Sequence, residues 1–432
     1  MNELAIELNE VLKTSLCYSL LSEEGKRLYF PKGIVAQAAE AGEKAKKYNA
    51  TAGLATKAGQ PFHFSDIMDM YKDGVFKPSD IFSYAPGGGD KKLRKLWKEE
   101  MIRKNPTLKG KKFGEPLVFG GLTHAISVAA TLFVPAGSTV VCPDLFWDNY
   151  DLIFSDLRGA ELKLFKFFND EGHLNVEGMK KALLECPGDA RIILNFPNNP
   201  TGYSPSVKEK DAIVKALKEV AKVKKVFVII DDAYFGLFFE EETNKESLFA
   251  DLVDLDENIF VAKGDAATKE YMVWGFRIGF LTFGGKGLSD DVYDALSKKA
   301  LGAIRCTVSN CDRPGQSMLV KALEEGKNTK RDMDDLFGEM KERYLALKEA
   351  LKKHEDEYDL LKPYPFNSGY FMAFSTLGRS AEGLRSYLLD KYQAGTVNIF
   401  DKTLRVAFCS VEKDKIRDLV DVIYKAAGEL WN

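Results

Sequence analysis

Short apolar runs alternate with amphipathic stretches from about residue 85 onward. Each run is rich in Val, Ile and Phe and is bounded by turn residues, which is typical of strands buried on both faces of a parallel sheet. The predicted strands are Leu117–Phe119, Thr139–Cys142, Arg191–Leu194, Val226–Ile230, Ile259–Ala262 and Ile278–Phe283. One of the intervening helices, over 207–223, is preceded by Ser206 and carries Glu209 three residues later, a capping box. This alternation predicts an α/β fold with a mostly parallel sheet flanked by helices.

The pattern changes after about residue 315. One or two long charged helices are predicted over 318–353, and then two strands over 369–375 and 403–408 precede a helix over 413–427. These elements indicate a second, smaller α+β domain. The sequence therefore predicts three parts: an N-terminal arm with part of the small domain (1–62), a large domain (63–325) and a C-terminal small domain (326–432).

Composition and charge narrow the possible partners. The chain has 432 residues, too many for one small core, with 45% hydrophobic and 29% charged residues, so disordered and fibrous proteins are excluded. Lys and Arg number 61 and Asp and Glu 64, and neither sign is in excess. We therefore expect neither nucleic acid nor a membrane as a partner.

The cysteines and the N-terminus favour a cytoplasmic location. None of the six cysteines forms a CxxC pair, and with only four histidines no zinc site is expected. A chain of this size needs no disulfides, so we expect reduced thiols. No apolar run reaches the ~18 residues that span a bilayer. Glu3, Glu7 and Glu10 make the N-terminus unlike a signal peptide.

Four polar residues stand at the ends of predicted strands. Lys269 lies in a loop after the strand 259–262, Asp231 ends the strand before it, Asn199 lies in the turn after 191–194, and Arg277 enters the last strand. Ligands of open α/β sheets bind at such ends. A surface lysine, a helix-capping aspartate, a structural Asn-Pro turn and an ion-paired arginine are the alternatives that remain open.

Four features of the sequence suit a flat, phosphorylated ligand. Gly121-Leu122-Thr123 connects a strand to a helix, and amides at a helix N-terminus bind phosphate. The guanidinium of Arg277 binds oxyanions in a bidentate manner. Trp147 follows the strand 139–142 and either stacks on a ring or packs in the core, while Tyr234 offers a hydroxyl. The GxGxxG dinucleotide fingerprint does not occur.

In this order, the motifs resemble those of fold-type I pyridoxal-phosphate (PLP) aminotransferases, and in particular class I enzymes of the aspartate aminotransferase group. The resemblance covers roughly residues 80 to 410 and implies a large domain with a mostly parallel seven-stranded sheet. The matching segments are Gly121-Leu122-Thr123, Trp147, Asn199-Pro200-Thr201-Gly202, Asp231-Asp232-Ala233-Tyr234, Ala266-Ala267-Thr268-Lys269 and Arg277-Ile278-Gly279.

The resemblance implies a role for each cofactor residue. Lys269 bonds covalently to PLP and acts as the base, Asp231 pairs with the pyridine nitrogen, and Trp147 stacks on the ring. Asn199 and Tyr234 bind the phenolic oxygen. The phosphate is held by Leu122, Thr123, Arg277 and, from a partner subunit, Tyr84, and Thr268 is a further cofactor-binding residue.

The resemblance also implies substrates and an assembly. Arg405, with Asn199, matches the residues that bind the substrate α-carboxylate. Arg305 matches the position that binds a side-chain carboxylate from across a dimer in aspartate aminotransferases. The expected substrates are therefore an L-amino acid, of the aspartate or glutamate type, and a 2-oxo acid such as 2-oxoglutarate. Neighbouring subfamilies also carry arginine at the position of Arg305. The expected assembly is a homodimer.

Two departures and two alternatives accompany this interpretation. Ala266 replaces the usual Ser/Thr phosphate ligand, and Tyr150 stands where aspartate enzymes often have His.

A PLP-dependent lyase or decarboxylase on the same fold would carry the same ring-binding residues. A PLP-sensing regulatory module is the other alternative, but the first 80 or so residues contain no basic recognition helix. The sequence thus predicts a ping-pong aminotransferase of amino acid metabolism and biosynthesis.

Overall fold

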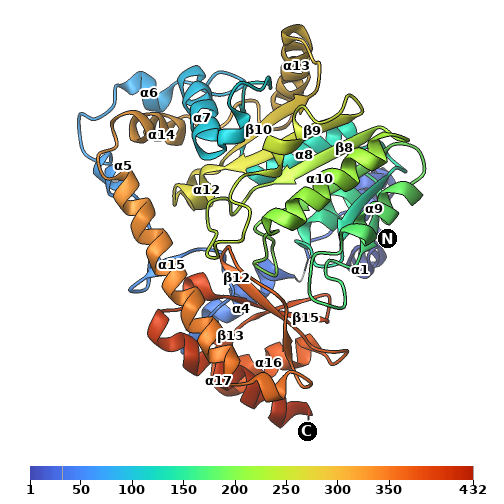
Figure 1. Cartoon of the computed structure of the whole chain (residues 1–432), viewed down its shortest axis with the longest axis vertical. Helices are drawn as coiled ribbons and strands as arrows, with labels where there is room; N and C mark the ends of the chain where they lie inside the picture. Colours follow the sequence, from blue (N-terminus) through green and yellow to red (C-terminus); the bar gives the residue numbers. More distant parts are fainter. Residues whose placement is uncertain (32, 432) are drawn as a thin grey trace.

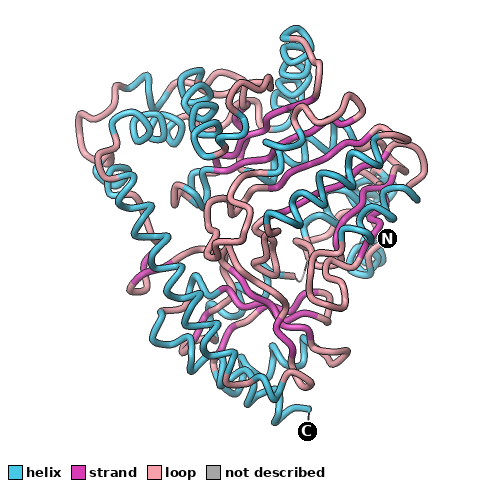
Figure 2. Tube along the Cα trace, viewed as in Figure 1, coloured by secondary structure: helices cyan, strands magenta, loops and turns pink. Residues whose placement is uncertain are grey.

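The structure is a computed structural model that describes residues 1–31 and 33–431. A large sheet with helices on both faces occupies the upper half of the molecule, and a smaller sheet with its own helices lies below (Figure 1). Most of the strands gather at these two places, and the long helix α15 (Thr329–Lys352) runs along one edge of the molecule between them (Figure 2). The expected fold-type I architecture is confirmed.

Among the described residues, seven strands form the large sheet, in the order β4-β10-β9-β8-β7-β5-β6. β10 is antiparallel to β4 and β9, and the neighbouring pairs from β9 to β6 are parallel. Their bounds are β4 Leu117–Gly120, β5 Thr139–Pro143, β6 Glu161–Phe165, β7 Ala190–Asn195, β8 Val226–Asp231, β9 Ile259–Ala266 and β10 Ile278–Gly285. The edge strand β6 was missed in the hydrophobic pattern because only its last residue is buried.

The end of β9 corrects one prediction. The strand continues to Ala266, and the one-turn helix α12 (Ala267–Glu270) follows at once, so Lys269 lies in a helix and not in a loop. Lys263 and Asp265 interrupt the apolar run and therefore disguised the strand in the sequence. In the fold they are buried as an ion pair, and this part of β9 pairs with β10.

Helices cover both faces of the large sheet (Figure 1). Asp90 caps α7 by accepting bonds from the amides of Lys92 and Leu93, and the predicted capping box of Ser206 and Glu209 opens α10. The helices of this part are α5 Ser65–Asp69, α6 Pro78–Phe82, α7 Lys91–Lys104, α8 Leu122–Phe133, α9 Val176–Glu185, α10 Val207–Ala221, α11 Leu248–Leu252, α13 Asp290–Thr307 and α14 Pro314–Glu325. A π-helical segment, Asp151–Leu157, follows β5.

The small sheet is antiparallel, in the order β11-β12-β15-β14, and the helices α15, α16 (Ala381–Tyr392) and α17 (Lys413–Trp431) pack on it or on one another. Its strands are β11 Lys362–Pro363, β12 Phe371–Ser375, β14 Val397–Ile399 and β15 Thr403–Ala407. An N-terminal segment joins this part: α4 (Ile34–Lys44) contacts β14 and α16, and β1 (Tyr48–Asn49) pairs in parallel with β13 (Ala394–Gly395).

The first residues form three short helices, α1 (Glu3–Leu12), α2 (Leu16–Leu20) and α3 (Glu23–Arg27). Within residues 1–31 and 33–431, no helix combines the length and the apolar character that crossing a bilayer requires. The same residues contain no group of His, Cys, Asp and Glu suited to a metal ion, and the six cysteines, all described, are free thiols.

Candidate active site

The predicted residues meet because of the strand directions. β4, β5, β7, β8 and β9 all end at one edge of the sheet, and β10, which runs the other way, begins there. Ile278 pairs with Gly120 and Gly279 with Ala266, so Arg277, although it precedes its strand, lies beside the residues that follow the others. Polar side chains from six strand ends are thereby brought to one place.

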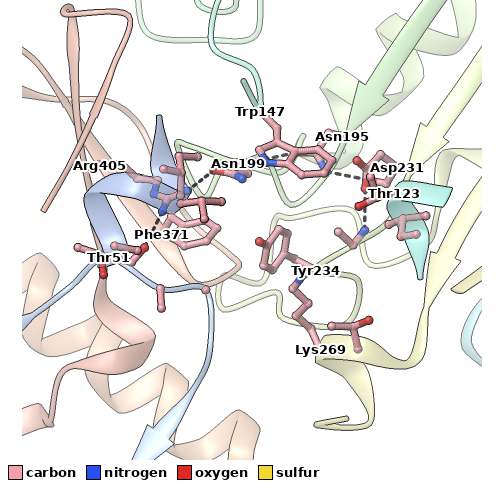
Figure 3. A pocket seen from close by; sticks show the side chains of 18 of the residues that line it. Thr51, Thr123, Trp147, Asn195, Asn199, Asp231, Tyr234, Lys269, Phe371 and Arg405 are labelled. Carbon is pink, nitrogen blue, oxygen red and sulfur yellow. Dashed lines mark hydrogen bonds between the residues drawn. The ribbon is translucent and has the colours of Figure 1, made fainter. Parts of the chain in front are cut away.

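A cavity of about 400 Å³ opens at this edge (Figure 3). Of the residues predicted from the sequence, those that line it are Leu122, Thr123, Trp147, Asn199, Asp231, Tyr234, Thr268, Lys269, Arg277 and Arg405. The cavity is also lined by Ala233, within the Asp231–Tyr234 motif, by Asn195 at the end of β7, and by residues from segments that the motifs did not include: Ile34, Val35, Ala38, Thr51, Ala52, Gly53 and Phe371.

Lys269 presents its amine to the cavity. The side chain is only partly exposed, Nζ lies 4.8 Å from the centroid of the Tyr234 ring, and no hydrogen bond or ion pair joins it to another described residue. The pKa of this amine is lowered to about 8, because burial and, to a smaller extent, the charge of nearby Arg277 disfavour the charged form, while Asp231 opposes the shift. About a tenth of the amine is therefore unprotonated at pH 7, far more than for an ordinary lysine, as a nucleophile or base requires.

Asp231 is held rigidly, with 3% of its surface exposed. Its Oδ2 accepts a 2.5 Å hydrogen bond from the hydroxyl of Tyr150, and its Oδ1 accepts one of 3.0 Å from the amide of Ala233. Burial raises the pKa of the carboxyl, and these two bonds limit the rise. Asp231 ends β8 without capping a helix, so the capping alternative is wrong.

Tyr150, which stands where the family pattern often has histidine, is a hydrogen-bond donor to Asp231. Its side chain is buried, and it stacks edge-on against Trp147 with ring centroids 5.6 Å apart while it donates to Asp231. The sequence revealed this residue only as a mismatch with histidine. Tyrosine supplies the same kind of hydrogen bond from a longer, neutral side chain.

The turn between β4 and α8 forms a cradle for an anion. Gly121 has φ +84°, and a Cβ there would lie 2.5 Å from Nη2 of Arg277, so only glycine fits. α8 begins at Leu122 without a side-chain cap, which leaves its first amides available. The hydroxyl-bearing side chains of Thr123 and Thr268 also line the cavity, whereas Ala266 is buried outside it.

Arg405 stands across the cavity on β15. It is 2% exposed, donates through Nη1 to Oδ1 of Asn199 at 3.0 Å and through Nη2 to the carbonyl of Thr51 at 2.7 Å, and lies over the Phe371 ring (Figure 3). Its Nε has no hydrogen-bond partner and its charge no ion-pair partner among the described residues. A buried guanidinium with an unused donor is suited to a carboxylate ligand.

Tyr84 and Arg305 lie away from this cavity. Tyr84 is 90% exposed, and Arg305, on α13, is exposed and contacts the hydroxyl of Ser309. Neither residue lines the cavity of its own chain as far as the described residues show. Their action across a subunit interface stays a prediction.

The donor set fits PLP. A partly unprotonated lysine, a buried carboxylate for a ring nitrogen and a cradle of amides, hydroxyls and a guanidinium for a phosphate share one cavity. The indole of Trp147 provides an aromatic face beside them.

Comparisons with known sequences agree with this geometry. The family model "Aminotransferase class I and II" matches residues 54–423. The mitochondrial aspartate aminotransferase of Dictyostelium discoideum is 26% identical over 236 residues, which cover 54% of this chain and 53% of that one. The aspartate aminotransferase of Thermococcus kodakarensis is 28% identical over 239 residues, 55% of each chain. The chain thus spans about half the length of the curated relatives it matches.

Solved structures extend the likeness to almost the whole fold. An aminotransferase from Anaerococcus prevotii superposes with a TM-score of 0.82 at 25% identity, covering 94% of this chain and 99% of that one. An aspartate aminotransferase from Thermus thermophilus gives 0.73 over the same shares at 18% identity, which shows the fold alone. With the family model matching most of its length, the chain belongs to the class I and II aminotransferases, which depend on pyridoxal phosphate.

Proposed function

We propose that the protein is a PLP-dependent aminotransferase that moves the amino group of an L-amino acid to a 2-oxo acid such as 2-oxoglutarate. The observation that carries the proposal is the partly unprotonated Lys269, which shares one cavity with the buried Asp231 and with an Arg405 that has no ion-pair partner among the described residues. A covalent anchor, an electron-withdrawing partner and a carboxylate clamp are the three groups that transamination requires.

When bound, the cofactor supplies an electron sink for the bond broken at the substrate Cα. Lys269 would anchor the cofactor through its amine, and the same amine would move the proton at the substrate Cα as a general base. A base positioned in this way contributes about 10²–10⁴-fold. Asp231 would favour a protonated ring nitrogen, and Tyr150 and the amide of Ala233 keep its carboxylate in place.

The other lining residues bind and orient. The amides of Leu122 and Thr123, the hydroxyl of Thr268 and the guanidinium of Arg277 would hold the phosphate, with Thr268 in place of the contact absent at Ala266. Trp147 would provide an aromatic face for the ring, and Asn199 and Tyr234 would bind its phenolic oxygen. Arg405 clamps the substrate α-carboxylate, with its unpaired Nε as one donor.

We further propose a homodimer in which Tyr84 completes the phosphate site of the partner and Arg305 enters the partner's cavity. The exposure of Tyr84, and of Phe82 two residues before it, supports a covered surface there.

A preference for aspartate and glutamate rests on Arg305 alone. If it exists, Arg305→Ala lowers kcat/KM for aspartate at least about tenfold more than for phenylalanine. Equal losses would contradict it. A cytoplasmic location stays a prediction.

The decisive experiment supplies purified protein with PLP and follows two signals. The first is the visible absorbance of lysine-bound cofactor, and the second is the formation of glutamate from 2-oxoglutarate with a panel of L-amino acids. Lys269→Ala abolishes both, because the anchor and the base are the same atom, whereas Lys286→Ala, at an exposed lysine, leaves both unchanged. Release of pyruvate or ammonia without an added oxo acid would indicate the lyase alternative, and a colourless wild type would refute the proposal.

A further inference from the structure

A buried asparagine that the motifs did not include joins two strand ends at the cavity. Asn195 is the last residue of β7 and pairs in parallel register with Asp231, the last residue of β8. It is 6% exposed and forms part of the cavity wall. Its Nδ2 donates to the carbonyl of Asp231 at 2.9 Å, and its Oδ1 accepts from the backbone amide of Asn199 at 2.8 Å (Figure 3). One side chain therefore bonds to both neighbouring segments.

Both bonds of Asn195 are made to main-chain groups. They fix the backbone of Asp231 and of Asn199, and leave the side chains of these two residues available to the cavity, which both of them line. Loss of the Asn195 side chain would take one partner from a buried carbonyl and one from a buried amide, and such losses are costly. The side chain thus stabilises the relative position of the two backbone segments.

The side chain of Asn199 is oriented by a different residue. Its Oδ1 accepts from Nη1 of Arg405 at 3.0 Å. A guanidinium only donates, so the oxygen of the Asn199 amide faces Arg405 and its Nδ2 remains as the donor. This Nδ2 donates to none of the described residues. Asn199 therefore offers one oriented donor to a ligand of the cavity.

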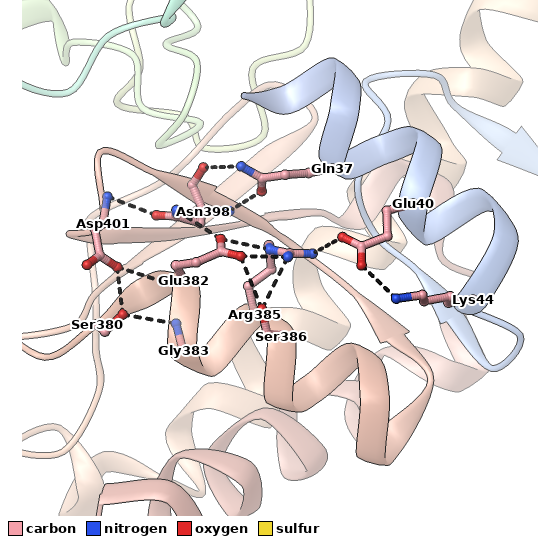
Figure 4. Close-up of polar contacts among 10 residues, drawn as sticks. All are labelled: Gln37, Glu40, Lys44, Ser380, Glu382, Gly383, Arg385, Ser386, Asn398 and Asp401. Atoms are coloured by element: carbon pink, nitrogen blue, oxygen red, sulfur yellow. Dashed lines mark hydrogen bonds and ion pairs between the residues drawn. The ribbon is translucent and has the colours of Figure 1, made fainter. Parts of the chain in front are cut away.

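Arg405 is itself held in place by the N-terminal segment that joins the small sheet. Its Nη2 donates to the carbonyl of Thr51 at 2.7 Å. In the same segment, Gln37 fastens α4 to β14, because its Nε2 donates to the carbonyl of Asn398 at 3.1 Å and its Oε1 accepts from the amide of Asn398 at 2.7 Å (Figure 4). The guanidinium that orients Asn199 thus has a fixed position.

The spacing between Asp231 and Asn199 must match a rigid ligand. The proposed function assigns Asp231 to the ring nitrogen and Asn199 to the phenolic oxygen of PLP. The ring nitrogen and the carbon that carries this oxygen are separated by one ring carbon, with no rotatable bond between them. Because hydrogen bonds weaken steeply with distance and angle, the two partners must be placed to within about 0.5 Å. The pairing of β7 with β8 places Asp231, whereas Asn199 lies in the turn beyond β7.

We propose that Asn195 is a positioning residue that sets the spacing between Asp231 and the free Nδ2 of Asn199, so that the ring nitrogen and the phenolic oxygen are bound at the same time. This inference rests on the proposed function and deepens it. The bonds that carry it all lie within one chain, so it requires no residue of a partner subunit.

Calorimetry on the full-length protein stripped of its cofactor tests the proposal. The probe is 4-deoxypyridoxine 5′-phosphate, which has the ring nitrogen, the phenolic oxygen and the phosphate but no aldehyde, so it cannot bond covalently to Lys269 and needs no turnover. We expect Asn195→Ala to weaken its binding about tenfold, the equivalent of one lost hydrogen bond. Asn195→Ser keeps a donor and an acceptor on a shorter side chain, and we expect a loss of only about threefold.

Asn367→Ala is the matched control. Asn367 is 7% exposed and also bonds to the backbone in both directions, since it donates to the carbonyl of Ser204 and accepts from its amide, each at 2.9 Å. It is not among the described residues that line the cavity. We expect both alanine variants to lower the midpoint of urea unfolding, and only Asn195→Ala to weaken binding of the probe. Equal weakening by both would overturn the proposal.

A double substitution separates positioning from stability. Asn199→Ala removes the donor that Asn195 positions but keeps the backbone amide to which Asn195 bonds. In this background we expect Asn195→Ala to weaken binding of the probe by less than about twofold, because the two substitutions remove the same interaction. The same tenfold loss in both backgrounds would show that Asn195 is only structural.

Failure of this proposal and failure of the proposed function are distinguishable. If the wild type binds the probe but transfers no amino group, the aminotransferase proposal fails, and the double substitution still decides the role of Asn195. A wild type that does not bind the probe would overturn both. If Asn195→Ala does not fold, Asn195→Ser gives the same comparison in both backgrounds, with a threefold loss that disappears in Asn199→Ala as the expected result.

Discussion

Two buried lysines, six residues apart in the chain, have opposite environments. Lys263 lies in β9, is 1% exposed, and forms ion pairs of 2.8 Å with Asp232 and 2.6 Å with Asp265. Burial alone would lower the pKa of Lys263, but the two carboxylates outweigh it and raise that pKa. Lys269 faces the cavity without such a pair, and burial lowers its pKa to about 8.

The comparison distinguishes charged residues that stabilise the fold from charged residues that are available for catalysis. Asp231 and Asp232 show the same division, because successive side chains of a strand point to opposite faces. Asp231 faces the cavity and is bonded to Tyr150, whereas Asp232 is bonded to Lys263 and to the hydroxyl of Ser247. A buried lysine with its carboxylates satisfied is structural, and one without a partner is available to react.

Replacing each lysine by methionine gives the largest expected contrast. Lys263→Met leaves Asp232 and Asp265 buried without a cation, and we expect the free energy of unfolding to fall by about 3–5 kcal/mol. Lys269→Met in the cofactor-free protein removes a largely desolvated charge that Asp231 compensates only in part, and we expect a gain of roughly 1–2 kcal/mol at pH 7. Urea unfolding of both variants and of the wild type measures the difference.

The sign of the Lys269 effect follows from its lowered pKa. The folded state disfavours the charged amine below pH 8, and this penalty disappears as the pH rises toward the ordinary lysine value of about 10.4. The gain in Lys269→Met therefore shrinks between these two values. Equal destabilisation by both substitutions at pH 7 would show that the two lysines are not different in kind.

The reactivity of Lys269 toward an amine-selective reagent gives the next contrast. In the cofactor-free protein, we expect the labelling rate of Lys269 to rise with pH and to level off above about pH 8, since only the unprotonated amine reacts. Mass spectrometry of the Lys269 peptide across a pH series measures the midpoint. A midpoint near the ordinary lysine value would mean that the cavity does not perturb this amine.

Tyr150→Phe, which removes the hydroxyl that donates to Asp231, gives the smallest expected effect. Loss of the hydroxyl leaves Oδ2 without that donor, and we expect PLP affinity to weaken about tenfold and stability to fall by about 1–2 kcal/mol. Tyr203→Phe is a matched control, because Tyr203 donates to Glu209 outside the cavity. If both variants lose the same PLP affinity, Tyr150 acts only on stability.

Much of the large sheet, and most of the cavity residues assigned to the cofactor, could be predicted from the sequence. Most strands of the sheet are continuous apolar runs, and a polar residue at the end of such a run or in the turn after it, as at Asp231 or Asn199, marks the edge where ligands bind. The same reasoning failed where polar residues are buried in pairs, as Lys263 and Asp265 hid the end of β9. It also failed at the edge strand β6, whose residues are largely exposed.

The amino-acid sequence by itself determined the alternation of strands and helices, the identity of the reactive groups and their order along the chain, because these are local properties of residue type and spacing. The tertiary structure alone decided that Arg277 meets Gly121 through the antiparallel β10, that Tyr150 bonds to Asp231, and that α4 completes the cavity wall from a segment over 200 residues from Lys269. Such contacts depend on strand direction and packing between distant segments, which no local pattern encodes.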